Sequence, residues 1–541
     1  MDNTKSEAEQ TPSRHAATAS ALGTEMALYA VPLVTLLVLR LLLPATICDD
    51  AYISFKVADN LASGFGMVFN PHENIYVSTS PLWVLLLAAA RLLTGDVVIA
   101  AKVLGLTAEA LLTVSLCYLT HKTTGSAKSG MFAGLFLITN PAYTLTSFSG
   151  MELPLFLLAI TATGIFLAQR RYTAAILISA TCVWIRFDGI TIFAAACAYT
   201  IWNQRQHIRS QWPTVARQVI PGALLLLCYV AFGFIFFETC LPMSVQRKAL
   251  TAPRLLSPEW IGGTIAIAKE FINAILGRSW FWYYCKTPFL ISAIPLCCIG
   301  AAFLVFTKRT TANALLFLTT VLVAAFTASG SSYAIVFPWY FAPIIPASSL
   351  LSAAGLHCAL LATCRRFGRA DYLGYLYAVA TTLWLATSLP PLFIDASRLV
   401  RIENGRERMY ATAALWAGKH QGNEVAIAAN EIGAIGFFLP REARVLDMFG
   451  LLSTRETLGV PFVRRIGNES PDCIFTRQLF SYKTAISLEL PEKYEWFSFR
   501  DLEIGIRSDL VSSLEPCLPD LERIYESIDM RYRNLDNLRP E

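Results

Sequence analysis

Two adjacent carboxylates, Asp49 and Asp50, follow the first long apolar segment of the chain. Like charges side by side raise one pKa, and partial burial raises it further. Such a pair can hold a general base or bind a divalent cation such as Mg²⁺, Mn²⁺ or Ca²⁺. It can also simply cap a short helix predicted over residues 51–62. The two residues are therefore candidates for catalysis, for metal binding or for helix capping.

A second group of ionisable residues lies at the ends of later apolar segments. Arg186 and Asp188 separate two short apolar runs, and ionisable groups at membrane depth usually line a functional cavity. These two residues can also simply pair with each other. Arg247 and Lys248 can bind a phosphate outside the bilayer or lie against lipid headgroups. The residues predicted to line a substrate cavity are Tyr52, Lys56, Asn60, Glu152, Asp188, Trp339 and Tyr340.

These residues stand in a chain with the composition of a membrane protein. Of its 541 residues, 55% are hydrophobic and 15% are charged, and the mean hydropathy is +0.49. A soluble globular chain carries about 25% charged residues. The composition excludes a disordered chain, a collagen-like chain, a small disulfide scaffold and a wholly soluble enzyme. The net charge of +5 gives no basic face for nucleic acid.

Charge divides the chain into two parts. Residues 1–395 hold 25 basic and 17 acidic side chains, whereas residues 396–541 hold 19 and 22. We therefore predict a disordered cytoplasmic tail over residues 1–25, a multi-span membrane domain over 26–394 and a C-terminal extracytoplasmic α/β domain over 395–541. Within the membrane domain, residues 47–96 form the first outer loop with an interfacial helix, and residues 238–286 form a second large outer loop.

The membrane domain is predicted to span the bilayer about eleven times. A hydrocarbon core about 30 Å thick needs ~20 apolar residues per helix. The predicted spans are 26–46, 97–120, 129–147, 153–169, 172–186, 189–203, 217–237, 287–307, 313–336, 340–363 and 371–392. The apolar stretch 81–94 has only 14 residues, which favours an interfacial or re-entrant segment.

The distribution of charge orients these spans. With the N-terminus in the cytoplasm, the inner loops contain twelve basic residues and no acidic ones. Counting 81–94 as a span would reverse every later loop and destroy this pattern. The positive-inside rule therefore places Asp49, Asp50 and the C-terminal domain outside the cytoplasm. These basic residues are Lys122, Lys128, Arg170, Arg171, Arg205, Arg209, Arg217, Lys308, Arg309, Arg365, Arg366 and Arg369.

The C-terminal segment alternates strand-like and helix-like stretches. The sequence predicts an amphipathic helix over residues 403–419 and a helical turn over residues 431–438. It predicts strands over residues 425–429, 445–448, 496–499 and 504–507. This alternation predicts a small α/β domain, for acceptor recognition or for covering the site. The thirteen cysteines show no metal-ligand spacing, but two outer pairs, Cys240–Cys285 and Cys473–Cys517, are candidates for disulfides.

The order of motifs resembles the GT-C glycosyltransferases, and within them the subgroup of the mycobacterial terminal β-(1→2) arabinofuranosyltransferase and its bacterial relatives. The first outer loop carries Asp-Asp-Ala-Tyr-Ile, then Ala-Asp-Asn-Leu, Gly-Phe-Gly, Phe-Asn-Pro and Thr-Ser-Pro-Leu-Trp. Three later motifs match as well: Gly150-Met-Glu152, Arg186-Phe-Asp188-Gly, and Leu241-Pro-Met-Ser followed by Lys248. The segments 428–436 and 447–451 match the start of the family's C-terminal domain. The matches run in order from residue 47 to about 451.

The resemblance implies an inverting transferase that moves one sugar from a polyprenyl-phosphate donor to a cell-envelope glycan or lipid-linked acceptor. The reaction takes place on the outer face of the bacterial inner membrane. It implies that the catalytic aspartate is Asp49 or Asp50, and arabinofuranose is the sugar that the subgroup indicates. Arg186, Arg247 and Lys248 are then candidates for binding the donor phosphate, where a cation or metal assists its release.

Two other functions fit the same composition. A transporter or flippase of lipid-linked glycans also has buried charges and many spans, but the sequence has no recognisable inverted repeat. A non-catalytic partner in glycan assembly can keep the same fold. A transferase forms new glycosidic bonds and loses this activity when Asp49 and Asp50 are substituted. This result distinguishes it from the transporter and from the non-catalytic partner.

Overall fold

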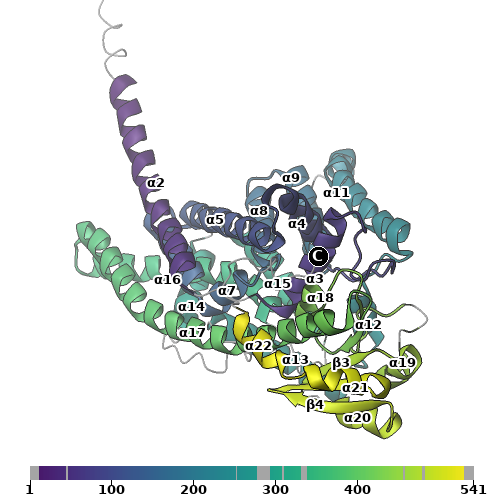
Figure 1. Cartoon of the computed structure of the whole chain (residues 1–541). Helices are drawn as coiled ribbons and strands as arrows, with labels where there is room; N and C mark the ends of the chain where they lie inside the picture. Colours follow the sequence, from purple (N-terminus) through teal and green to yellow (C-terminus); the bar gives the residue numbers. More distant parts are fainter. Residues whose placement is uncertain are drawn as a thin grey trace, which may run out of the picture.

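The computed structural model describes residues 11–43, 47–206, 208–250, 253–276, 293–307, 310–329, 338–454, 457, 459–477 and 482–528. Within these residues, a large bundle of helices carries a small domain of strands and short helices at one end (Figure 1). The N-terminal helix α2 projects from the other side of the bundle (Figure 1). The predicted fold class, a helical polytopic membrane protein with a C-terminal α/β domain, is confirmed.

In the described residues, each predicted span overlaps a helix or a pair of helices, whereas residues 287–292 and 330–336 of two predicted spans lie outside the described residues. These helices are α2 (Thr11–Leu42), α5 (Val97–Thr124), α6 (Ala127–Thr139), α7 (Pro141–Ser147), α8 (Leu153–Ala168), α9 (Tyr172–Ile185), α10 (Gly189–Asn203), α11 (Ile208–Phe237), α14 (Ala293–Phe306), α15 (Asn313–Ala328), α16 (Ile345–Arg366) and α17 (Leu373–Gln421).

Five helical segments in the described residues are long and apolar enough to cross a membrane. They are Glu25–Leu42, Val97–Thr124, Trp212–Phe237, Ala342–Arg366 and Leu373–Arg398. Other apolar helices have only 10–17 residues. Since a spanning helix needs ~20 residues, the figure of eleven spans stays a prediction.

Two predicted boundaries differ from the structure. Residues 11–25, predicted as part of a disordered tail, belong to helix α2, in keeping with the high helix propensity of their several alanines. Residues 1–10 lie outside the described residues. The predicted span 129–147 is divided into α6 and α7 at Asn140, which is followed by Pro141. The Asn140 side chain accepts hydrogen bonds from the amides of Ala142 (2.9 Å) and Tyr143 (3.3 Å), and so caps a new helix.

Shorter helices lie between the long helices of the bundle. They are α3 (Asp49–Ala62), α4 (Pro81–Thr94), α12 (Met243–Leu250), α13 (Pro258–Ile275), η3 (Pro338–Tyr340), η4 (Ala342–Ile344) and η5 (Ala370–Tyr372). Helix α4 has 14 residues, as expected of a segment that does not span the bilayer. Its buried Trp83 donates an indole N–H hydrogen bond to the Gly150 carbonyl (3.3 Å), which ties α4 to the turn before α8.

Helix α17 runs without interruption from the bundle into the C-terminal domain. It has 49 residues, contains Pro390 and Pro391, and ends at Gly422, whose φ is +84°. The predicted domain boundary at residue 395 lies inside this helix. The last part of α17, predicted separately as an amphipathic helix over 403–419, therefore belongs to both domains.

The C-terminal domain is built around a mixed sheet of five strands. The strands are β1 (Ala426–Ala429), β2 (Arg444–Asp447), β3 (Cys473–Arg477), β4 (Tyr494–Phe499) and β5 (Leu502–Arg507), in the order β2-β1-β3-β5-β4. Strands β2, β1 and β3 are parallel, and β5 is antiparallel to both β3 and β4. The strand β3 was not predicted, because its five residues precede a short polar segment without a clear turn signal.

Helices cover both faces of this sheet. Ile427, Ala429 and Phe475 pack with α17 and α18 (Gly433–Phe438), whereas Ala428 and Ile474 pack with α19 (Phe462–Glu469) and α20 (Tyr482–Glu489). Four short elements follow the last strand: η7 (Ser508–Leu510), α21 (Val511–Leu514), η8 (Glu515–Cys517) and α22 (Asp520–Ser527).

The first loop holds one edge of the sheet. The Asn70 side-chain amide donates to the Val445 carbonyl (2.9 Å) and accepts from the Val445 amide (3.0 Å), so it meets β2 as a neighbouring peptide group would. Beside it, Arg444 forms an ion pair with Glu73 (2.6 Å). The first loop is therefore joined to the C-terminal domain along β2.

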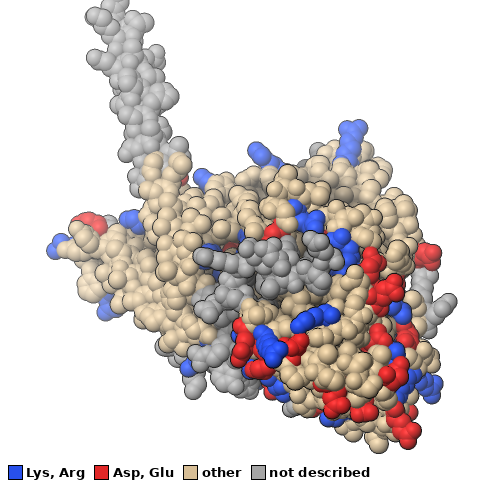
Figure 2. Space-filling model, viewed as in Figure 1, with Lys and Arg blue, Asp and Glu red and all other residues tan. Residues whose placement is uncertain are grey.

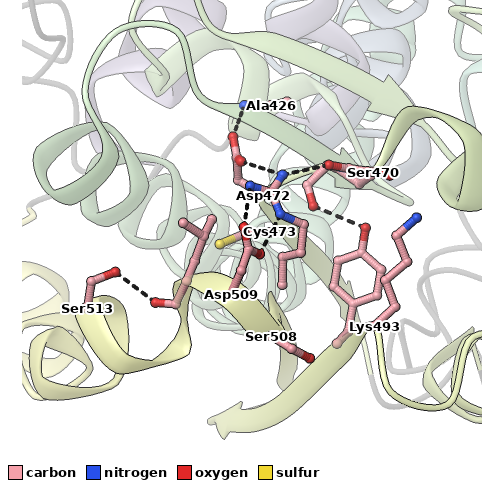
Figure 3. A network of polar contacts seen from close by, with 12 residues as sticks. Ala426, Ser470, Asp472, Cys473, Lys493, Ser508, Asp509 and Ser513 are labelled. Carbon is pink, nitrogen blue, oxygen red and sulfur yellow. Dashed lines mark hydrogen bonds and ion pairs between the residues drawn. The ribbon is translucent and has the colours of Figure 1, made fainter.

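A polar network ties together the amino ends of β1 and β3 (Figure 3). The Asp472 carboxylate accepts a hydrogen bond from the Ala426 amide (2.8 Å) and pairs with Arg507 (2.9 Å), which also donates to the Ser470 carbonyl (2.9 Å) and to Asp509 (2.7 Å). The network holds the strands in register and leaves its charges paired.

The predicted disulfides are not supported where they can be examined. Cys473 and Cys517 are both unbonded cysteines. The sulfur of Cys473 accepts a hydrogen bond from Gln421 (2.9 Å), and the buried position of Cys473 on β3 separates it from η8. The predicted pair Cys240–Cys285 falls partly outside the described residues, because Cys285 is among residues 277–292.

The surface repeats the division seen in the sequence. Figure 2 shows a mostly uncharged surface over the helical bundle and intermingled acidic and basic side chains over the C-terminal domain. Apolar side chains such as Leu224, Leu227 and Phe234 on α11 are exposed, as expected of a helix that faces lipid.

Candidate functional site

Asp49 joins the first loop to the C-terminal domain. Its two carboxylate oxygens accept hydrogen bonds from the amides of Gly433 (3.0 Å) and Ala434 (2.8 Å), at the start of α18. A side chain at Gly433 would place its Cβ 1.9 Å from the Asp49 carbonyl oxygen, so only glycine permits this approach. Burial, together with the charge of the nearby Glu431, raises the pKa of Asp49 to about 7. Asp49 is thus a buried contact between domains.

Asp50 differs from its neighbour in being partly accessible. Burial raises its pKa, while the positive charges of Lys248 and Arg406 act in the opposite direction, and the net direction is upward. A carboxylate with a raised pKa is a stronger base than an ordinary aspartate. Asp50 therefore combines access, basicity and cationic neighbours.

Lys248 and Tyr340 form the cationic side of the site. Lys248 Nζ donates a hydrogen bond to the Tyr340 hydroxyl (2.8 Å) and lies 4.8 Å from the centre of its ring. The Tyr340 oxygen raises the pKa of Lys248, so the ammonium group stays charged at neutral pH. Helix α12 carries Lys248 and η3 carries Tyr340, 92 residues later in the chain.

Arg186 is the centre of a buried ion-pair triad beside them. It forms two parallel hydrogen bonds with Asp188 (3.1 and 3.2 Å) and one with Glu152 (3.2 Å). Its guanidinium carbon lies 5.3 Å from the centre of the Tyr340 ring. The turn between α9 and α10 is tight at Gly189, where a Cβ would lie 2.3 Å from the Cys182 carbonyl oxygen. The predicted pairing of Arg186 with Asp188 is therefore present, within a larger cluster.

The predicted site residues divide into two sets. The structure gathers Asp50, Glu152, Arg186, Asp188, Lys248 and Tyr340 at one end of the bundle, from five separate segments. Trp339 is 9% exposed and adjoins this set, with its ring 6.3 Å from that of Tyr340.

Three residues predicted to line the cavity are instead buried in the protein. Tyr52 packs against Phe437 and Phe438 of α18, with ring centroids 5.3 and 5.7 Å apart. Asn60 donates to the carbonyls of Val68 and Phe69 (both 3.0 Å), which shapes the chain after α3. The Lys56 side chain is also buried. The inner face of α3 is thus an interface with the C-terminal domain, which the sequence pattern alone does not distinguish from a cavity.

Arg247 lies on a different side of α12 from the cluster. Its Nε and Cδ atoms are 3.7 and 3.8 Å from the position of a Cβ at Gly450, so it contacts the turn after β2. Arg465 supports the same turn by donating to Ser453 Oγ (2.9 Å). The adjacent cations Arg247 and Lys248 therefore do not converge on one anion in this structure.

Several functional candidates were missed because they lie far away in the sequence. Arg406 and Glu407 of α17 and Glu431 after β1 surround the acidic pair, and all three affect the ionisation of Asp49 or Asp50. Arg406 hydrogen-bonds Glu407 (3.0 Å) and lies 3.7 Å from Glu431. The only signal in the sequence is the position of Glu431, directly beyond a strand and before Gly433.

The acidic residues do not form a ready metal site. Both oxygens of Asp49 are already used by α18 amides. Among the described residues, no group of three or more His, Cys, Asp or Glu side chains lies close enough to hold one metal ion. The donor set around Asp50 therefore does not fit a resident divalent cation, and the predicted metal site has no geometric support.

Comparisons with known proteins locate the chain among known folds. A family model described as a domain of unknown function (DUF8728) matches residues 399–512. A search of curated proteins finds no match. The crystal structure of ArnT from Cupriavidus metallidurans in the apo state has a TM-score of 0.54 and 14% identity, over 91% of this chain and 99% of that chain. The likeness shows that this chain has the same overall fold as ArnT.

Proposed function

We propose that this protein is a membrane glycosyltransferase that moves a sugar from a polyprenyl-phosphate donor to a glycan or glycolipid acceptor. The observation that carries the proposal is one partly accessible carboxylate, Asp50, within electrostatic reach of the exposed ammonium group of Lys248, at one end of the helical bundle. A base and an anion-binding cation side by side are what glycosyl transfer from a phosphate requires.

We assign Asp50, and not Asp49, as the general base that takes the proton from the acceptor hydroxyl. Both oxygens of Asp49 accept amide hydrogen bonds, so a proton transferred to it would weaken the contact between the domains. Asp50 makes no such contact in the described residues and is partly accessible. Asp49 is a positioning residue in this proposal, and Asp50 is the catalytic residue.

We assign Lys248 as the residue that binds the leaving phosphate. Arg186 is held by two carboxylates of this chain, Glu152 and Asp188, so its donors are already engaged and it is less suited than Lys248 to bind an incoming phosphate. Lys248 is bonded to the hydroxyl of Tyr340 and not to a carboxylate. The Lys248 ammonium has three rotatable donors that can turn from Tyr340 towards a phosphate oxygen. The triad then fixes the Tyr340 ring through the Arg186 face contact.

The reaction is a single displacement. Asp50 takes the proton from the acceptor hydroxyl, whose oxygen forms the new bond to the anomeric carbon of the donor sugar. The bond between that carbon and the phosphate oxygen breaks, and the phosphate leaves with the electron pair beside Lys248. No covalent intermediate with the enzyme is formed, so the configuration at the anomeric carbon inverts. No step is routed through a metal ion.

The sugar, the acceptor and the sidedness are finer parts of the proposal. The motif resemblance favours arabinofuranose as the first donor sugar to test, with a cell-envelope glycan as acceptor. The positive-inside pattern favours the outer face of a bacterial inner membrane. Reporter fusions at Gly125 and Gly422 should then report opposite sides of the membrane. The same side for both would refute the orientation.

The decisive test compares Asp50→Asn with Asp49→Asn in proteoliposomes supplied with polyprenyl-phosphate arabinofuranose and an acceptor glycan. Release of polyprenyl phosphate and formation of the new glycoside are measured together. We expect Asp50→Asn to lose at least 10²-fold in kcat, as is typical for removal of a general base. Asp371→Asn, at an exposed aspartate outside the site, is the matched control. Full turnover by Asp50→Asn would overturn the assignment, and uptake of donor without a new glycosidic bond would indicate a transporter.

A further inference from the structure

The carboxyl ends of β1 and β3 gather polar groups whose hydrogen bonds are unmet. In the described part of the chain, Tyr410 OH, Glu431 Oε2 and Arg477 Nε are buried atoms without a hydrogen-bond partner. Tyr410 is fully buried on α17, and the charges of Glu431, Asp49, Arg406 and Arg477 all act on it. An unmet buried polar group costs about 1–3 kcal/mol, so such a cluster is unusual unless a ligand completes it.

The opposite ends of the same strands provide an internal comparison. There the Asp472 carboxylate is satisfied by the Ala426 amide and by Arg507 (Figure 3). The domain therefore closes its polar network at the amino ends of β1 and β3 and leaves it open at the carboxyl ends.

The strand order explains why a ligand would bind there. In the order β2-β1-β3, the chain leaves β1 towards one side and returns to the other side of β1 to form β3. Ligands of open parallel sheets bind in the crevice outside the carboxyl ends, where the connections diverge. Glu431 follows β1, and Arg477 is the last residue of β3, so both lie at the carboxyl ends of these strands.

The carboxyl end of β1 adjoins the reaction centre. Asp49 holds the amides of Gly433 and Ala434, and this contact fixes Glu431, two residues earlier, relative to Asp50. The Glu431 charge acts on Asp50 as well as on Asp49. The Glu431 side chain is 19% exposed, so it is recessed but reachable.

We propose that Glu431, with Tyr410 and Arg477, forms the binding subsite for the acceptor sugar and presents its hydroxyl to Asp50. The ligand is a sugar residue, because Glu431, Tyr410 and Arg477 offer a carboxylate, a phenol hydroxyl and a guanidinium group, which hydrogen-bond to hydroxyl groups. A carboxylate accepts hydrogen bonds from two neighbouring hydroxyls, and arginine and tyrosine donate to the ring substituents. This inference rests on the proposed transferase function.

The first test measures kinetics of Glu431→Gln in full-length protein in nanodiscs, with polyprenyl-phosphate arabinofuranose as donor and octyl glycosides of several neutral sugars as acceptors. We expect the acceptor KM to rise about tenfold or more, while the donor KM and the slow hydrolysis of donor by water stay unchanged. Glu442→Gln, at an exposed glutamate of the same domain, is the control. An unchanged acceptor KM, or an equal loss of donor hydrolysis, would overturn the subsite.

A second variant separates loss of sugar binding from misfolding. Tyr410→Phe removes only a hydroxyl that has no partner in the described residues, so the fold loses no hydrogen bond. We expect an acceptor KM raised severalfold with an unchanged unfolding temperature, whereas Tyr375→Phe, at an exposed position of the same helix, should change neither. A wild-type acceptor KM in Tyr410→Phe would refute its contact with the sugar.

Binding without turnover separates this inference from the proposed function. Saturation-transfer NMR of the octyl glycosides with wild-type protein should detect binding that Glu431→Gln abolishes and Glu431→Asp partly restores. If binding depends on Glu431 but no glycoside is ever formed, the transferase proposal fails and the sugar subsite stands. If Asp50-dependent transfer proceeds while Glu431→Gln binds normally, the subsite fails and the transferase stands.

Discussion

Substitution of Gly433 by alanine should separate the C-terminal domain from the first loop. The added Cβ would lie 1.9 Å from the Asp49 carbonyl oxygen and 2.7 Å from its carbon, both backbone atoms that cannot rotate away. Reaching even a tight contact of 3.0 Å requires a retreat of about 1.1 Å. The two hydrogen bonds from Gly433 and Ala434 to Asp49, now 3.0 and 2.8 Å long, would stretch to about 4 Å and break.

The size of the effect follows from those two bonds. A hydrogen bond to a charged group contributes about 1.5–3 kcal/mol, so the loss of both weakens docking of α18 by about 3–6 kcal/mol. Since 1.4 kcal/mol is a factor of ten, the amides at the start of α18 should exchange with solvent roughly 10²- to 10⁴-fold faster. The acceptor-dependent rate should fall as well, because Glu431 moves with α18.

Hydrogen exchange with mass spectrometry measures this directly on the full chain in detergent or nanodiscs. Gly405→Ala is the control, since a Cβ there meets no atom within 4 Å and the residue lies in helix α17. It should leave exchange at α18 unchanged. Protection of α18 in Gly433→Ala equal to that of the wild type would show that Asp49 does not hold the two domains together.

Three further outcomes follow from the site and the sulfur atoms. Because Asp50 must be ionised to accept a proton and its pKa is raised, kcat/KM should fall as the pH drops through a value above the pKa of an ordinary aspartate. Lys248 lowers the pKa of Asp50, so Lys248→Gln should move this acidic limb of the pH profile to still higher pH. An unmoved limb would exclude the proximity of Lys248 and Asp50. Incubation with EDTA should change the transfer rate less than twofold, and a loss restored by Mg²⁺, Mn²⁺ or Ca²⁺ would show that a cation binds despite the donor geometry. In denatured, unreduced protein, Cys473 and Cys517 should both react with maleimide, whereas protection released by a reductant would contradict the unbonded cysteines.

Much of the bundle could be predicted because apolar length and charge are local properties of the sequence. The turn at Arg186 and the helix α4 were located from the lengths of their apolar runs alone. The break at Asn140 was missed because a hydropathy window averages over a single capping residue followed by proline. The start of α2 was missed because polar composition was weighed above the helix propensity of alanine.

The candidate site was predictable to a lesser degree. Asp50, Arg186 and Lys248 come together because the sidedness of the loops brings their segments to one end of the bundle. The side of the membrane on which a loop lies does not show which face of α3 packs against another domain. Tyr52 and Asn60 were therefore predicted to line a cavity, whereas both side chains are buried in the protein. Glu431 lies in the segment 428–436 that the motif resemblance includes, but its position beside Asp49 depends on docking between segments almost 400 residues apart.

The contact between Asn70 and β2 bears on how the C-terminal domain behaves when it is produced alone. Strand β2 is an edge of the sheet, and in the full chain the Asn70 amide occupies the N–H and C=O of Val445. A fragment beginning at residue 399 would lack that cover and present a bare strand edge, a template for strand addition between molecules. Self-association of such a fragment would therefore be an artefact of the cut. The opposite edge, β4, is where a strand of another protein could add to the intact chain.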